Sequence, residues 1–311
     1  MAVKKRVGLR PSSFTTSSTA AALHYGPVRS LLKFFALTYA VTWTCFFAAA
    51  VLSGGIGTFA PAAAALQMPL LMVGTFAPSL VALGITARDD GVRGVQVLLR
   101  RVLDSSVEGR WYVFAIGYMA AIKLSVAVVY RLATGSWPPF GSEPWYVIAA
   151  VIVMSTPVQA GEEIGWRGYA LPRLAAHFGF ARASLVLGLI WACWHLPLFF
   201  VPGIGNYGQS FPVFAAGGIA LSVAMTWLYV NTRGSLLLAM LMHSAVNQTM
   251  GIVPTRLAKP GSPLALDTSL VTWIFGAILW MTAAYFLARM RHVEFTASQQ
   301  RLTRAQVIAS R

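Results

Sequence analysis

The sequence predicts an all-α, polytopic membrane protein with about eight transmembrane helices and an amphipathic helix on the inner membrane surface. Two observations predict this fold class. Of the 311 residues, 57% are hydrophobic and 11% are charged, with a mean hydropathy of +0.66, so the chain carries more apolar surface than a water-soluble core could bury. The apolar residues also gather in stretches of about 20 residues, the helix length that crosses a hydrocarbon layer of about 30 Å.

Eight such stretches follow one another along the chain, at 31–52, 61–86, 111–132, 145–165, 183–201, 211–231, 234–250 and 268–288. The second contains Pro61, Pro69 and Pro78, which a helix tolerates at its ends or at kinks, and the seventh is short. We divide the rest of the chain around these stretches. The segments are a disordered basic cytoplasmic arm at 1–30, the N-terminal helices at 31–144, a core at 145–252, the last loop and helix at 253–290, and a basic cytoplasmic tail at 291–311.

The basic residues predict the orientation, because Lys and Arg stay on the cytoplasmic side of membrane spans. With both termini inside, the outer loops hold only Arg131, Arg256 and Lys259. The inner segments hold nineteen: Lys4, Lys5, Arg6, Arg10, Arg29, Arg88, Arg93, Arg100, Arg101, Arg110, Arg167, Arg173, Arg182, Arg233, Arg289, Arg291, Arg301, Arg304 and Arg311. We therefore expect a multi-pass cell-membrane protein with both termini in the cytoplasm.

The net charge of +15 needs no nucleic-acid partner. Basic inner loops that face anionic lipid headgroups produce it, and no basic module with interleaved aromatic residues is visible. Membrane lipid is therefore the expected partner, and nucleic acid is not. Cys45 and Cys193 both fall inside predicted spans, so neither a disulfide framework nor a cysteine-based zinc site is implied.

The inner loop at 92–103 has a pattern of its own. Its apolar residues recur at helical spacing, while Arg93, Gln96, Arg100 and Arg101 take the other face. This pattern predicts an amphipathic helix that lies on the inner membrane surface and connects two spans.

Three polar clusters lie in the second half of the chain. Glu162 and Glu163, two of only nine acidic residues, end the predicted span at 145–165 near the cytoplasmic face and are followed by Arg167. Because Glu163 and Arg167 are four residues apart, they share a helix face and can pair, whereas Glu162 points elsewhere. Gly161 and Gly165 give the same helix a small face on which another helix can pack closely.

The other two clusters are Trp191-Ala-Cys-Trp-His195 and His243-Ser-Ala-Val-Asn247. His195 and His243 fall inside predicted spans, and Asn247 follows His243 by one helical turn on the same face. Each polar residue alone is more often a packing or ion-pair residue than a catalyst. Together with a carboxylate, they predict a site sheltered in the membrane.

These residues fit hydrolysis of a peptide bond. Glu162 and His195 could bind and deprotonate a water, while His243 and Asn247 could donate hydrogen bonds to the oxyanion. Zinc is the alternative, since Glu162, His195 and His243 form an adequate ligand set for a catalytic ion with an open position. The residues do not separate the two mechanisms. Neither a His-Glu-x-x-His motif nor a pair of intramembrane aspartates is present.

The order Glu-Glu-x-x-x-Arg, aromatic-x-x-x-His and His-x-x-x-Asn resembles the CPBP family of intramembrane endopeptidases, the type II CAAX prenyl protease and bacteriocin-processing group. The resemblance covers about residues 145–250 and implies that 145–252 is a protease core. It implies that Glu162 and His195 activate water, that His243 and Asn247 stabilise the oxyanion, and that Glu163 and Arg167 shape the site. It also implies a cavity open to the cytoplasm. Many members have Phe where this chain has Trp191.

Two other classes of function remain open from the residues. A non-catalytic scaffold or immunity factor would keep the fold and need only the packing face at Gly161 and Gly165. A transporter would use Glu162 and Glu163 as a protonatable pair, although the halves of the chain share no repeated pattern. The substrate is expected to be a peptide or a membrane-associated protein, and whether it is prenylated is open.

Overall fold

The computed structural model describes residues 28–54, 56, 65–254, 263–266, 268–291 and 293, and these contain helices and no strand. Six helical segments within them are long and apolar enough to cross a membrane. The chain is therefore an all-α, polytopic membrane protein, as predicted. Almost all of the predicted arm at 1–30 and tail at 291–311 lies outside the described residues.

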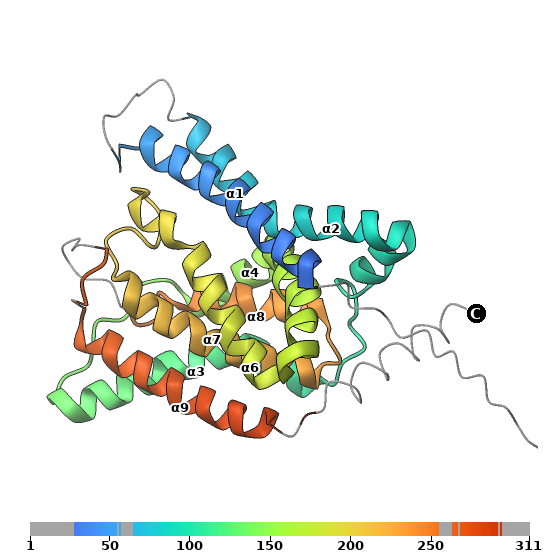
Figure 1. Cartoon of the computed structure of the whole chain (residues 1–311). Helices are drawn as coiled ribbons and strands as arrows, with labels where there is room; N and C mark the ends of the chain where they lie inside the picture. Colours follow the sequence, from blue (N-terminus) through green and yellow to red (C-terminus); the bar gives the residue numbers. More distant parts are fainter. Residues whose placement is uncertain are drawn as a thin grey trace, which may run out of the picture.

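The first three helices are α1 (Val28–Leu52), α2 (Gln67–Arg100) and α3 (Gly109–Thr134). Helices α1 and α2 pack against each other along one side of the molecule (Figure 1). At Gly91 the backbone of α2 leaves the helical region with φ 67°, a conformation that favours glycine. The predicted amphipathic segment is therefore a separate helical piece that spans 92–100.

The prediction that Arg101 belongs to the polar face of this segment is wrong. Its guanidinium turns into the protein and donates to the carbonyl of Gly234 at 2.9 Å, the carbonyl of Gly168 at 3.3 Å and the hydroxyl of Tyr229 at 2.6 Å. The end of α2 is thus tied to the loop that precedes α8.

A long helical run carries the predicted spans 145–165 and 183–201. It consists of α4 (Trp145–Ser155), a 3₁₀ turn (Thr156–Gln159), α5 (Ala160–Glu163), a π-helix (Ile164–Ala170), α6 (Leu171–Trp194) and a second 3₁₀ turn (Leu196–Phe200). The chain reverses at Gly179, which has φ 72°. The predicted helix end at 165 is therefore wrong, because the helical run continues to 178.

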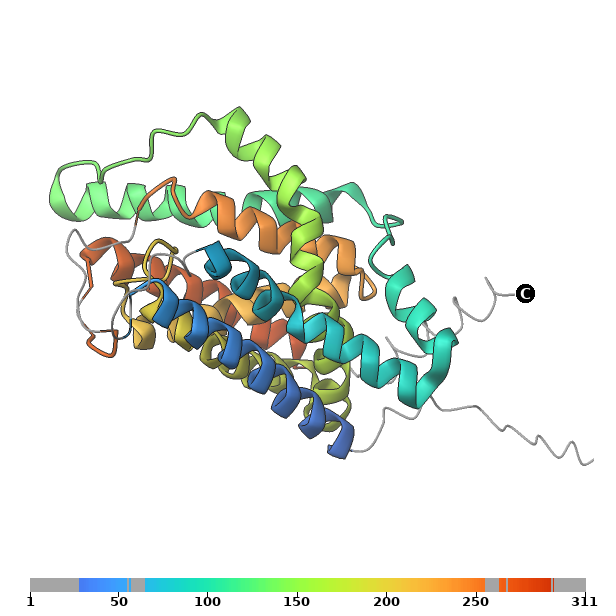
Figure 2. The same ribbon diagram turned by 90° about the horizontal axis from the view of Figure 1, so that it is seen from above.

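The remaining helices are α7 (Phe211–Asn231), α8 (Leu236–Thr249) and α9 (Leu270–Met290). With 14 residues, α8 is only about 21 Å long and is not among the six candidate spans. It is largely buried and packs against α3, α4 and α7 inside the bundle (Figure 2). On the outer helices α1 and α9, large apolar side chains stay exposed, as expected of surfaces that face lipid.

The helices give the bundle two distinct ends. At one end α1 and α3 begin and α7 and α9 finish; we call it the basic end. At the opposite end the 3₁₀ turn 196–200 stops and α7 and α9 begin (Figure 1). Among the described residues, the opposite end carries Arg131, whereas the basic end carries Arg29, Lys33, Arg88, Arg93, Arg100, Arg101, Arg110, Arg173, Arg182, Arg233, Arg289 and Arg291.

The predicted close approach at Gly161 and Gly165 is confirmed. A Cβ added to Gly165 would lie 2.6 Å from the carbonyl carbon and oxygen of Pro78 on α2, and one added to Gly161 would meet Phe76 at 3.0 Å. The hydroxyl of Ser79 also donates to the carbonyl of Ala160 at 2.5 Å. Helix α2 thus holds α5 and the π-helix in place.

Gly165→Ala is therefore expected to lower the free energy of unfolding by about 1–3 kcal/mol, because the backbone of Pro78 would have to shift. Gly117→Ala on α3 is the matched control, since a Cβ there meets nothing within 4 Å, and alanine has the higher helix propensity. Thermal unfolding of both variants in detergent measures the difference. Equal midpoints would contradict the close packing.

Candidate active site

The helix that carries the acidic pair departs from regular α geometry. Pro157 lacks a backbone N–H, and the chain passes through a 3₁₀ turn before α5 and a π-helix after it. Such π segments re-aim side chains and frequently occur at functional sites. Glu163 and Arg167 are wholly buried and Glu162 is 7% exposed. The prediction that Glu162 and Glu163 end a helix is therefore wrong, because the helix continues past them and both side chains lie inside the protein.

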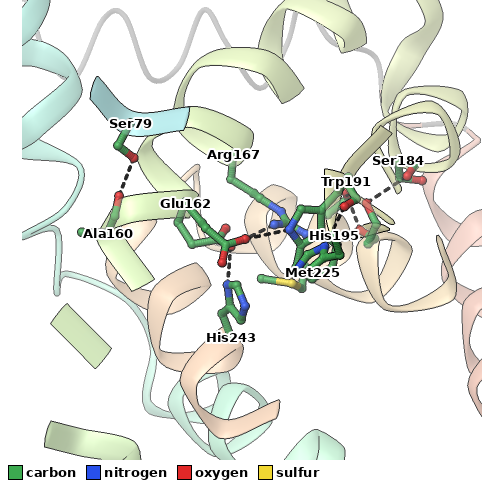
Figure 3. A network of polar contacts seen from close by, with 12 residues as sticks. Ser79, Ala160, Glu162, Arg167, Ser184, Trp191, His195, Met225 and His243 are labelled. Carbon is green, nitrogen blue, oxygen red and sulfur yellow. Dashed lines mark hydrogen bonds and ion pairs between the residues drawn. The ribbon is translucent and has the colours of Figure 1, made fainter. Parts of the chain in front are cut away.

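Glu163 is the centre of a buried charge network, and its partners Arg167 and His243 are labelled in Figure 3. Its Oε1 accepts from Arg167 at 2.9 Å, which confirms the predicted pair, and from Nδ1 of His243 at 2.7 Å. Arg167 also contacts Sδ of Met225 at 3.1 Å, and its guanidinium lies 4.5 Å from the ring centre of Trp191. Among the described residues, Oε2 of Glu163 has no hydrogen-bond partner.

Trp191 connects the remaining site residues. Its indole N–H donates to Oε2 of Glu162 at 2.8 Å, and its carbonyl accepts from Nδ1 of His195 at 2.8 Å (Figure 3). The indole ring also lies edge-on to the rings of His195 and His243, with centroids 5.3 and 5.4 Å apart. Sequence reasoning treated Trp191 only as an aromatic residue. The signal it missed is that an indole has an N–H donor and a phenyl ring has none.

The contacts of the two histidines define which ring atoms remain for chemistry. Because a carbonyl only accepts, Nδ1 of His195 carries the proton, and the neutral ring keeps Nε2 as an acceptor. The ring is held between Trp194 at 4.7 Å and Phe214 at 5.4 Å. In His243 the Nδ1 atom is used by Glu163, so Nε2 is the atom left for another partner.

Part of the predicted site lines a cavity of about 200 Å³. Trp191, His195, His243 and Asn247 all contribute to its wall, whereas Glu162 lies behind Trp191. Asn247 is exposed on α8, one turn beyond His243. The structure thus brings His195, His243 and Asn247 to one cavity, with the Glu163 network and Glu162 behind its wall.

The cavity lies toward the opposite end of the bundle. Part of its polar lining comes from residues between 206 and 210 and between 268 and 272, next to the starts of α7 and α9, and its apolar lining includes Met119, Leu221 and Leu279. The prediction with both termini in the cytoplasm puts these segments on the outer side.

The zinc alternative requires Glu162, His195 and His243 to bind one ion together, and the structure does not place them so. Within the part of the chain that the structure describes, no three His, Cys, Asp or Glu side chains lie where they could hold a metal ion together. Nδ1 of His195, Nδ1 of His243 and Oε2 of Glu162 are each engaged by a protein group. Each histidine keeps Nε2 for another partner, so it is the placement of the three side chains, and not these hydrogen bonds, that does not fit a zinc site.

Comparison with known proteins gives two matches. Residues 142–249 match the family model described as "Type II CAAX prenyl endopeptidase Rce1-like". Over 135 residues the chain is 27% identical to "CAAX prenyl protease 2" of Methanococcus maripaludis. That alignment covers 42% of this chain and 48% of the relative, so the chain spans about half the length of the curated relative it matches. All six predicted site residues lie within 142–249.

Proposed function

Because residues 142–249 belong to the Rce1-like type II CAAX prenyl endopeptidase family, we propose that this chain is an intramembrane endopeptidase. It hydrolyses a peptide bond in a peptide or a membrane-associated protein. The observation that carries the proposal is the buried Glu163–His243 pair, which stands directly beside Glu162 and the cavity wall. A carboxylate, a guanidinium and an imidazole inside a membrane protein are costly to desolvate, which argues for their use.

Glu162 is the proposed base. It keeps a 7% exposed fraction while Glu163 is wholly buried, so Glu162 is the carboxylate that a water can reach. With His195 it takes a proton from the water as the oxygen bonds to the peptide carbonyl carbon. The proton then passes to the leaving nitrogen as the C–N bond breaks, giving a carboxylate and an amine.

His243 and Asn247 are the proposed donors to the oxyanion. Both line the cavity from one face of α8, and donors fixed in advance stabilise the charge that develops there. In its protonated form His243 keeps Nδ1–H on Glu163 and presents Nε2–H to the cavity. Glu163 and Arg167 act as positioning residues through His243 and Trp191.

The membrane topology is part of the proposal. The start of α1 and the end of α9 lie at the same end of the bundle, and the basic residues favour the cytoplasm for that end. Both termini are then cytoplasmic, the eight predicted stretches alternate in direction, and the segment 92–100 lies at the inner surface against lipid headgroups. The helical run Trp145–Phe200 contains two of these stretches, and α8 corresponds to the short, buried seventh stretch.

Glu162→Gln and His195→Ala test the proposed function. Both variants are expected to let an uncleaved membrane-associated substrate accumulate while the protein remains folded. A non-catalytic scaffold predicts the reverse: both variants would keep their full biological effect, and changes at Gly161 and Gly165 would abolish it.

Trp191→Phe is expected to lower kcat about tenfold to a hundredfold. The phenyl ring keeps the packing but cannot donate to Glu162, and a hydrogen bond to a charged group contributes about 1.5–3 kcal/mol. Trp43→Phe is the matched control, since its indole donates only to the carbonyl of Trp194, at 3.2 Å. Steady-state cleavage of the identified substrate measures both variants. Equal kcat values in wild type and Trp191→Phe would remove Trp191 from the mechanism.

A further inference from the structure

A second cavity lies at the basic end of the bundle, between the chain reversal at Gly179 and the end of α9. Its volume is about 440 Å³, within the roughly 300–1,000 Å³ of ligand pockets. Residues 178–182 and Leu185 of α6 form one wall, and Leu287 with residues 290, 291 and 293 forms the other. The two cavities share no lining residue, so this one is separate from the candidate active site.

Two arginines give the second cavity its charge. Arg182 and Arg291 both line it, and its described lining includes no Asp or Glu. Both arginines are exposed, and the ion pairs among the described residues involve neither of them. A guanidinium presents its N–H donors as a planar fork that matches the oxygens of a phosphate group. The two side chains therefore offer a site for an anionic group of this kind.

The rest of the lining is apolar and lies at the end of a membrane span. Phe178 is 50% exposed, and Leu185 and Leu287 are partly exposed. The second wall is the last turn of α9, which is one of the candidate spans, so the cavity falls where headgroups meet hydrocarbon. A free anion would contact only the two arginines, whereas a phospholipid would contact the arginines and the apolar walls together.

We infer that this cavity binds one anionic phospholipid, with its phosphate held by Arg182 and Arg291 and its acyl chains along Leu185 and Leu287. Basic pockets between transmembrane helices recognise lipid headgroups in this way. The bound lipid would join the start of the helix that ends at His195 to the last helix of the bundle. It would also stabilise the folded protein, since the unfolded chain has no such pocket. The inference depends neither on the proposed endopeptidase function nor on the side of the membrane that the basic end faces.

Lipid titration of the delipidated, full-length protein in a neutral detergent tests this site. Native mass spectrometry counts the molecules of phosphatidylglycerol or phosphatidylcholine that remain bound. We expect wild type to retain a single phosphatidylglycerol in preference to phosphatidylcholine. Arg182→Gln/Arg291→Gln is expected to weaken phosphatidylglycerol binding at least about tenfold, because two cations that face the phosphate are lost.

Arg93→Gln/Arg100→Gln is the matched control. It removes two exposed positive charges from the same end of the bundle, and neither residue lines the cavity. This variant is expected to bind phosphatidylglycerol as wild type does. Equal loss in the two double variants, or equal retention of both lipids by wild type, would overturn the inference.

Two further measurements separate a lipid site from a site for any anion. Ala181→Trp fills the cavity without changing its charge and is expected to weaken phosphatidylglycerol binding as much as the Arg182→Gln/Arg291→Gln variant. Inorganic phosphate and glycerol 3-phosphate carry the anion without acyl chains, and neither is expected to displace the lipid at equal concentration. Displacement by either one, or unchanged lipid binding by folded Ala181→Trp, would overturn the inference. Thermal midpoints of the variants without lipid check their folds.

Discussion

Replacing Glu162 with Gln is expected to reduce peptide-bond cleavage by about 10²–10⁴-fold, the contribution of a positioned general base. The amide keeps the size of the side chain and its acceptor oxygen for the indole of Trp191, which donates at 2.8 Å, so the packing is preserved while the proton acceptor is lost. Quantification of new peptide N-termini in membranes of cells that express wild type or Glu162→Gln measures the change. The precursor of each lost terminus is expected to accumulate and so identifies the substrate.

Glu108→Gln is the matched control for this experiment. The side chain of Glu108 is 68% exposed, and its partner Arg110 is equally exposed, so the substitution is expected to leave the set of termini unchanged. Size-exclusion profiles and thermal midpoints of the purified variants check the fold. A folded Glu162→Gln protein that produces the same termini as wild type would contradict the assignment of Glu162 as the base.

Arg167→Met is expected to destabilise the protein by about 3–5 kcal/mol. Among the described residues, the substitution leaves the buried Glu163 with His243 as its one remaining ionic partner. Breaking a buried ion pair leaves the other charge without a partner or solvent. It also removes the guanidinium that lies 4.5 Å from the centre of the Trp191 ring. The free energy of unfolding in detergent, or the thermal midpoint, measures this effect.

A second Arg–Glu pair in the same chain provides the control. Arg110 and Glu108 lie at the same 2.9 Å separation, but their side chains are 69% and 68% exposed, against 0% for Arg167 and Glu163. Arg110→Met is expected to change stability by at most about 1 kcal/mol, as exposed pairs do. Glu163→Gln added to Arg167→Met is expected to recover part of the loss. Equal effects of the two Arg→Met variants would contradict the role of burial.

The composition and the apolar stretches were sufficient to predict an all-α membrane protein, because nothing else accounts for that much hydrophobic surface. The end of the helix at 145–165 was predicted wrongly for a physical reason. Glu163, Arg167 and His243 satisfy one another inside the protein, so the helix need not stop where the charges begin. Arg101 was misplaced on a polar face for a similar reason, since its partners Gly168, Tyr229 and Gly234 lie far along the chain.

At the site, helical spacing was enough to predict the Glu163–Arg167 pair and the shared face of His243 and Asn247. The contact of His243 with Glu163 was not predictable, because it joins residues 80 positions apart. The role of Trp191 was missed because a donor and its acceptor in different helices leave no local pattern. The location of the cavity depends on where the loops before α7 and α9 meet, which periodicity does not specify.

The central claim is that Glu162 drives hydrolysis of a peptide bond by water, and oxygen-18 incorporation tests it most directly. Purified wild-type protein and Glu162→Gln are incubated in H₂¹⁸O with membranes from cells that lack the chain, and the new C-termini are analysed by mass spectrometry. The account predicts peptides whose new C-terminal carboxylate carries one ¹⁸O atom, formed by wild type and not by Glu162→Gln. The absence of such labelled termini with folded wild-type protein, or their equal formation by both proteins, would contradict it.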